Sequence, residues 1–180
     1  AEALRLRPDY YEAHYNWGTA LAAQGLQGEA VDKYRDAIAR RPDSADAYCR
    51  LGTSLQRLGR LDEAAAAYEQ TLRLRPRDVA ACCNLGTVLH EQGHTDRAID
   101  CFETALQADP DTAGTYNNLG NALHQIGQEQ RAEECFARAL QLAPDFADAH
   151  YNRALVYLSR EEFAAGWREA RRGVRAERSG

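Results

Sequence analysis

This chain of 180 residues has no methionine, a single lysine and no long apolar run. Lys33 is its single lysine and lies outside any Gly-Lys-Ser/Thr sequence, so the chain has no phosphate-cradling loop of that type. The net charge of −5 gives no reason to expect nucleic acid as a partner, because phosphate binding needs a clustered excess of basic residues. No apolar run approaches the ~18 residues that span a bilayer, and nothing at the start resembles a signal peptide, so we expect no membrane partner.

The cysteines show no pattern typical of a disulfide framework or a metal site. There are five, an odd number, and no two of them form a Cys-x-x-Cys pair. Cys82 and Cys83 are adjacent, so they point to two different faces of a helix. We therefore expect free thiols in a reduced cytoplasm, with no disulfide, metal or other cofactor.

What the sequence does contain is a repeat with a period of 34 residues. The five prolines lie 34 residues apart, at Pro8, Pro42, Pro76, Pro110 and Pro144. Eight of the thirteen glycines fall on two other phases of the same period, namely Gly18, Gly52, Gly86 and Gly120, and Gly25, Gly59, Gly93 and Gly127. A period of this length is typical of a solenoid of stacked units.

Each unit carries two apolar patterns of helical spacing. In the first complete unit, Trp17 and Leu21 belong to one helix, and Ala30 and Tyr34 belong to a second. Gly25 lies between them and predicts a turn, because glycine takes the left-handed conformation that closes a helix. Equivalent turns are expected at Gly59, Gly93 and Gly127. Each proline then ends the second helix.

The small residues have a predicted packing role. Gly18 and Ala30, with their equivalents one period apart, should lie where the two helices of a unit cross most closely. A side chain at these positions would force the helices apart. The large rings four residues after the alanine, at Tyr34, Tyr68, Phe102 and Phe136, are expected to fill the gap to the neighbouring unit.

The combination of Leu-Gly, Ala, Tyr/Phe, Ala and Pro on this period closely resembles the tetratricopeptide repeat. Between positions 79 and 112 it reads Leu85-Gly86, Ala98, Phe102, Ala105 and Pro110. The resemblance implies an all-α fold, a right-handed superhelical solenoid of antiparallel helix pairs with about five repeats and an N-terminal remnant. The predicted boundaries are 1–10 for the remnant, 11–44, 45–78, 79–112 and 113–146 for four repeats, and 147–180 for a degenerate C-terminal repeat or capping helices.

Both ends depart from the pattern. Residues 1–10 match only the tail of a repeat, so we expect further repeats before them and weak end-to-end self-association through Leu4 and Leu6. In the last repeat, Arg153 and Ala154 replace Leu-Gly. Its ending, from Phe163 to Arg168, resembles the final repeat of bacterial repeat proteins that continue into a glycosyltransferase-like domain.

One short motif points to a different chemistry. His90-Glu91-Gln92-Gly93-His94 satisfies His-Glu-x-x-His, which in zinc proteases places both histidines one turn apart on a continuous helix. The repeat places Gly93 at a turn, so His94 should lie beyond the helix end, and no third ligand is evident. We interpret the match as coincidental and expect no catalytic residue.

The resemblance also implies a concave surface, lined by the first helix of each unit, that binds an extended peptide or protein segment. Carried onto this sequence, the inward positions selected as the site are Asn16, Arg50, Asn84, Asn118, Asn152, Thr53, Thr87, Asn117, Asn121, His90, His124 and Arg57. The row of asparagines resembles that of O-GlcNAc transferase-like proteins, where amides that donate and accept bind a peptide backbone. Asparagine is also common at this phase in the family, which is the alternative explanation.

Two further observations narrow the function. Arg50 and Arg57 are the only inward basic residues, so the carboxylate clamp of chaperone-binding family members is incomplete. Arg168, Arg171, Arg172 and Arg175 form a basic stripe that we interpret as a solvated capping face. The main hypothesis is therefore a non-catalytic interaction module that serves as the recognition arm of a larger glycosyltransferase-like protein, and the alternative is a free-standing scaffold for multiprotein assembly.

Overall fold

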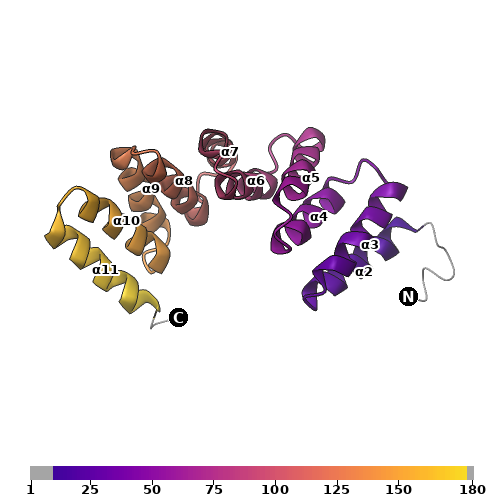
Figure 1. Ribbon diagram of the computed structural model, residues 1–180, viewed down its shortest axis with the longest axis horizontal. Helices are drawn as coiled ribbons and strands as arrows, with labels where there is room; N and C mark the ends of the chain where they lie inside the picture. Colours follow the sequence, from indigo (N-terminus) through magenta and orange to yellow (C-terminus); the bar gives the residue numbers. More distant parts are fainter. Residues whose placement is uncertain (1–9, 178–180) are drawn as a thin grey trace. The chain divides into compact units, whose positions relative to one another are not determined.

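The structure, a computed structural model, describes residues 10–177, and within that range it contains ten α-helices and no strand (Figure 1). The helices are α2 (Tyr11–Ala23), α3 (Gln27–Arg40), α4 (Ala45–Arg57), α5 (Leu61–Leu74), α6 (Val79–Glu91), α7 (Thr95–Ala108), α8 (Ala113–Gln125), α9 (Glu129–Leu142), α10 (Ala147–Ser159) and α11 (Phe163–Glu177). The predicted all-α class is confirmed. None of the helices described is both long and apolar enough to cross a membrane.

The chain divides into two compact units, with the boundary between Val88 and Leu89 inside α6. In the first unit, α2 pairs with α3 and α4 with α5, and α4 packs on both α2 and α3. In the second, α8 pairs with α9 and α10 with α11, while α7 contacts α8, and α10 contacts α8 and α9. Within each unit, therefore, one helical hairpin stacks on the next. The remnant predicted at residues 1–10, with Leu4 and Leu6, lies almost wholly outside the described residues.

The predicted glycine turns are present, and all have the same geometry. Gly25 has a φ of 81°, its N–H donates to Ala22 O at 3.1 Å, and the N–H of Leu26 donates to Leu21 O at 3.0 Å. This pair of bonds is the Schellman ending of a helix, which needs a left-handed residue one position past the cap. Gly59, Gly93 and Gly127 repeat it. In the fifth hairpin, the position is held by Glu161 with a φ of 63°, which the sequence analysis did not foresee.

Proline ends the second helices as predicted. α3 ends at Arg40, two residues before Pro42, and α5, α7 and α9 end at the same distance from Pro76, Pro110 and Pro144. The residue between helix and proline is extended, for example Arg41 with φ −138° and ψ 85°. This is the conformation that a following proline ring imposes.

The core confirms the role predicted for the small residues. Tyr34, Tyr68, Phe102 and Phe136 are at most 1% exposed. A Cβ atom built on Gly18, Gly52 or Gly120 would lie 2.9, 2.7 or 2.5 Å from the ring of the same hairpin. Those distances are too short for any side chain, so these three hairpins close only because the glycine leaves room for the ring. These three rings thus lie against the glycine of their own hairpin, whereas the sequence predicted that they fill the gap to the neighbouring unit.

Candidate binding surface

In the first unit the structure brings three of the predicted site residues together. Arg50, Thr53 and Arg57 project from α4 and line a pocket of about 190 Å³. The opposite wall comes from α2 and α3 and includes Thr19 and Tyr34. Arg50 and Arg57 are exposed, whereas Thr53 is half-buried. The pocket therefore has two accessible cations above a floor of hydroxyl groups.

The threonine hydroxyls of this surface already have partners inside the protein. Thr19, Thr53 and Thr87 each donate to the carbonyl oxygen four residues earlier, at 3.0 Å. The Tyr34 hydroxyl donates to Thr19 Oγ1 at 3.4 Å, and the Tyr68 hydroxyl donates to Thr53 Oγ1 at 3.2 Å. These bonds link the two helices of a hairpin, so Thr19 and Thr53 help to position the pocket wall.

Arg50 is held in place by the preceding repeat. A hydrogen bond to Tyr15 raises the pKa of the Arg50 guanidinium, and the proximity of Tyr15 and Tyr34 adds to the shift. Burial raises the pKa of the Tyr34 hydroxyl, although the hydrogen bond to Thr19 and the charge of Arg50 oppose it. Tyr34 thus stays neutral near pH 7, and the charge of the pocket comes from Arg50 and Arg57.

The asparagines are divided between the units. In the first, Asn16 is exposed and Asn84 is half-buried; in the second, Asn118, Asn121 and Asn152 are half-buried. Asn117 is only 6% exposed and accepts a hydrogen bond of 3.0 Å from Asn152 Nδ2. Arg50 and Tyr15 are also 35 residues apart. In both pairs, the residue at the sixth position of a first helix contacts the residue at the fifth position of the preceding first helix. Part of the asparagine row is therefore used within the fold.

The two histidines of the predicted site lie in last turns of helices. Both are half-buried, and His124 Nδ1 lies 2.8 Å from Glu129 Oε2 across the turn between α8 and α9. His90 precedes the left-handed Gly93, and α6 ends at Glu91, so His94 lies beyond the helix. The zinc-protease chemistry requires both histidines on one continuous helix. The His-Glu-x-x-His segment of this chain does not form one.

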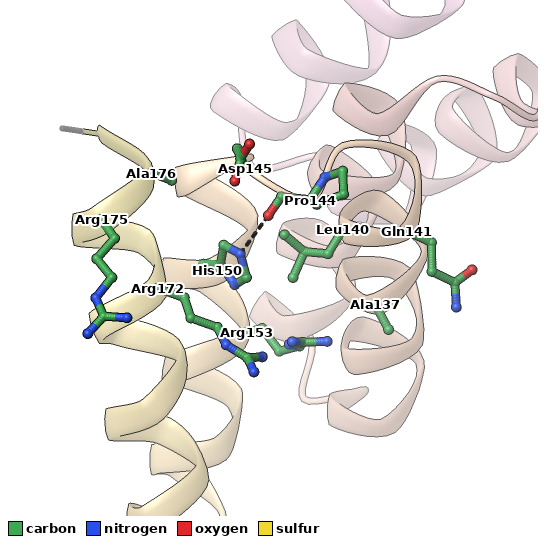
Figure 2. A pocket seen from close by; sticks show the side chains of 10 residues that line it. All are labelled: Ala137, Leu140, Gln141, Pro144, Asp145, His150, Arg153, Arg172, Arg175 and Ala176. Carbon is green, nitrogen blue, oxygen red and sulfur yellow. Dashed lines mark hydrogen bonds between the residues drawn. The ribbon is translucent and has the colours of Figure 1, made fainter. Parts of the chain in front are cut away.

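A second cluster of polar side chains was missed by the sequence analysis. His150 and Arg153 from α10 meet Glu169 from α11. His150 is 7% exposed and Glu169 is 5% exposed, whereas Arg153 is half-buried. Figure 2 shows this region, with a dashed line from the His150 ring to the carbonyl oxygen of Pro144. The available signal was Glu169 itself, the single acidic residue between Arg168 and Arg175, although the arginines around it were interpreted as a solvated face.

Comparison with known proteins identifies the repeat. A family model described as tetratricopeptide repeat matches residues 49–111, 83–145 and 117–176, and one described as TPR repeat matches residues 18–59. The comparison with curated proteins found no match.

Several solved structures have the same fold. MamA 41-end from Desulfovibrio magneticus RS-1 is 21% identical, with a TM-score of 0.88 over 94% of this chain and 96% of that one. YrrB, described as a TPR protein with an unusual peptide-binding site, is 20% identical, with a TM-score of 0.81 over 97% and 90%. PilF of Pseudomonas aeruginosa is 22% identical, with a TM-score of 0.83 over 92% and 76%. From the matched repeats, which extend from residue 18 to residue 176, we conclude that the chain belongs to the tetratricopeptide repeat family.

Proposed function

We propose that the chain is a non-catalytic protein-interaction module that binds an extended peptide on the first helices of its hairpins. The observation that carries the proposal is the pocket beside α4, where Arg50 and Arg57 lie above hydroxyl groups already fixed by internal hydrogen bonds. Side chains held in place before binding lose little conformational freedom when a ligand arrives. That YrrB is described as having a peptide-binding site supports a peptide as the ligand class.

The spacing of the two arginines defines the ligand further. Arg50 and Arg57 are seven residues apart on α4, which corresponds to about 10 Å along a helix. Three residues of an extended chain cover about the same length. Guanidinium groups bind carboxylates through paired hydrogen bonds. We therefore expect a peptide with two acidic residues three positions apart.

A matched pair of variants tests this. The probe is a glycine-serine peptide with glutamates at positions i and i+3, compared with the same peptide carrying glutamines, and binding is measured by fluorescence anisotropy. Replacing Arg50 and Arg57 together by Ala should weaken binding of the glutamate peptide at least ~tenfold, because both charge-assisted contacts are lost. Arg73→Ala with Arg77→Ala removes the same charge from exposed positions outside this pocket and should leave the affinity unchanged. Equal losses in both double variants would contradict the proposal.

The remaining site residues stay a prediction. In the first unit, replacing Asn16 and Asn84 by Ala should weaken the same peptide if their amides bind its backbone. Unchanged affinity would limit the binding site to the arginine pocket.

Two roles remain for such a module. The recognition arm of a glycosyltransferase-like protein rests on the asparagine row and on the residues from Phe163 to Arg168, and the comparisons lend this role no support. A free-standing scaffold needs only the repeats. The gene sequence on both sides of this chain distinguishes them, because the first role requires a catalytic domain after Gly180.

Sedimentation at increasing protein concentration tests the predicted end-to-end self-association.

A further inference from the structure

The last helical hairpin contains a group of charges that takes no part in the proposed peptide pocket. Glu169 lies at its centre, and His150 Nδ1 and Arg153 Nη2 are both 2.7 Å from its Oε2 atom. Arg172 Nη1 lies 2.9 Å from the other oxygen, Oε1. Three donors thus share one buried carboxylate, which leaves Glu169 little capacity to accept a further hydrogen bond.

The group carries an excess of positive charge. His150 Nε2 lies 2.9 Å from the carbonyl oxygen of Pro144, so both ring nitrogens lie within hydrogen-bond distance of an acceptor. The guanidinium groups of Arg153, Arg172 and Arg175 line the same pocket as Asp145, with Glu169 beneath them. Arginine side chains therefore outnumber carboxylates among these residues.

The pocket that these side chains line is open to a ligand. It has a volume of about 530 Å³ and is bounded by α9, α10 and α11 (Figure 2). The Arg172 side chain is 56% exposed, so its remaining N–H groups are accessible. Arg153 is only 15% exposed, and its Nε atom is buried without a hydrogen-bond partner among the residues described. A buried N–H group of this kind is uncommon in proteins, and the same guanidinium group lines the pocket.

We propose that this pocket binds a phosphate group carried on a peptide. A phosphate monoester has a charge of about −1.5 to −2 and three acceptor oxygens, so it offers the three guanidinium groups more charge and more acceptors than a carboxylate does. Guanidinium forks match phosphate oxygens in paired hydrogen bonds. The apolar wall of Ala137, Leu140 and Pro144 suits the carbon atoms of the side chain that bears the phosphate. No aromatic ring is found among the described residues that line the pocket, so it offers no surface on which a nucleobase stacks.

Calorimetric titration of the whole chain tests the proposal with four probes. These are a glycine-serine peptide with one phosphoserine, the same peptide with serine, the same peptide with glutamate, and inorganic phosphate. We expect the phosphopeptide to bind at least ~tenfold more tightly than the glutamate peptide, because it places more charge and more acceptors among the arginines. The serine peptide should not bind. Inorganic phosphate should bind more weakly than the phosphopeptide, because it makes no contact with the apolar wall.

Arg172→Gln provides the matched test, because this side chain is more than half exposed and its loss leaves Arg153 and His150 in contact with Glu169. It should lower the affinity for the phosphopeptide at least ~tenfold. Arg73→Gln, at an exposed position in α5, removes the same charge and should not change the affinity. In NMR spectra, the Nε–H signal of Arg153 should shift on addition of the phosphopeptide.

Three results would overturn the proposal: equal binding of the serine and phosphoserine peptides, equal losses in the two arginine variants, or an unmoved Arg153 signal. Inorganic phosphate that binds as tightly as the phosphopeptide would refute the peptide as carrier. None of these results affects the pocket beside α4, because Arg50 and Arg57 do not line this one.

Discussion

A missing side chain sets the distance between the two helices of the hairpins that contain Gly18, Gly52 and Gly120. Gly120 lies against Phe136, and Gly52 lies against Tyr68, so closely that a Cβ atom would meet the ring at 2.5 and 2.7 Å. Other glycines have no such role, since Gly28 and Gly114 have nothing within 4 Å of the position of a Cβ atom. The same residue type therefore has opposite consequences at two kinds of helical position.

Gly120→Ala and Gly114→Ala, both in α8, test this difference. The first should destabilise the protein by ~1–3 kcal/mol, because Phe136 or the helix backbone must move to admit the methyl group. The second should be neutral or stabilise it by up to ~1 kcal/mol, because alanine favours helix and meets no neighbour. Urea unfolding followed by circular dichroism measures both. A Gly120→Ala variant as stable as Gly114→Ala would contradict the packing argument.

Burial also controls the chemistry of a cysteine. The five cysteines form no disulfide, and burial raises the pKa of Cys135 to about 11, an effect that the nearby Arg131 only partly offsets. Only the thiolate reacts with alkylating reagents. At pH 8, Cys135 should therefore react with iodoacetamide much more slowly in the native protein than in urea. Mass spectrometry of timed digests measures the two rates, and equal rates would show that the thiol is not buried in solution.

At the scale of helices, one backbone conformation closes the first helix of every hairpin. Four of these endings have glycine at the left-handed position, and the fifth has Glu161, with a φ of 63°. The hydrogen bonds are nevertheless the same, since the N–H of Glu162 donates to Tyr157 O at 2.8 Å. The last hairpin thus adopts this ending at the cost of a strained residue.

Exchanging the two residue types should change stability in opposite directions. Glu161→Gly should stabilise the protein by about 1 kcal/mol, because glycine adopts a positive φ without the clash of a Cβ atom. Gly127→Ala, at the equivalent turn with nothing within 4 Å, should destabilise it by ~1–2 kcal/mol for the same reason. Thermal unfolding of both variants provides the measurement. A loss of stability in Glu161→Gly would mean that the glutamate side chain makes a contact that outweighs the strain.

The pairing of α10 with α11 should depend on pH through Glu169. Burial alone would raise the pKa of Glu169, but hydrogen bonds from His150 and Arg153 and the charge of Arg153 lower it below its ordinary value of 4.5. Because the native carboxyl has the lower pKa, the unfolded state binds more protons, and stability rises with pH between the two values. The contribution of Glu169 is complete above about pH 4.5 and is lost as the pH falls through the native pKa.

Comparison of the wild type with Glu169→Gln isolates this contribution. At pH 7 the variant should be less stable by about 3 kcal/mol or more, because it leaves the largely buried guanidinium group of Arg153 without its counter-ion. The difference should shrink below pH 4.5, where the wild-type carboxyl also becomes neutral. Unfolding by urea at several pH values between 3 and 7 measures it. A difference that is constant over this range would show that the charge of Glu169 is not what stabilises the helix pair.

For the whole chain, the sequence predicts those features that the repeat encodes in single residues. Gly25 and Pro42 mark helix ends by backbone chemistry that needs no tertiary partner, and their equivalents do the same along the chain. Charges and hydroxyls were harder to place, because their environment depends on residues far along the chain. Glu169 is buried by His150, 19 residues away, and Asn117 is paired with Asn152, 35 residues away. Neither partner lies on the same helix, so helical spacing alone does not reveal them.

The proposed function requires that a ligand peptide lies on first helices and not on second helices. Photo-crosslinking of the glutamate peptide, carrying a benzophenone between its two acidic residues, tests this requirement most directly within the first unit. Mass spectrometry should find the crosslinks in α2 and α4, around Asn16, Arg50 and Arg57. Crosslinks confined to α3 and α5 would contradict it.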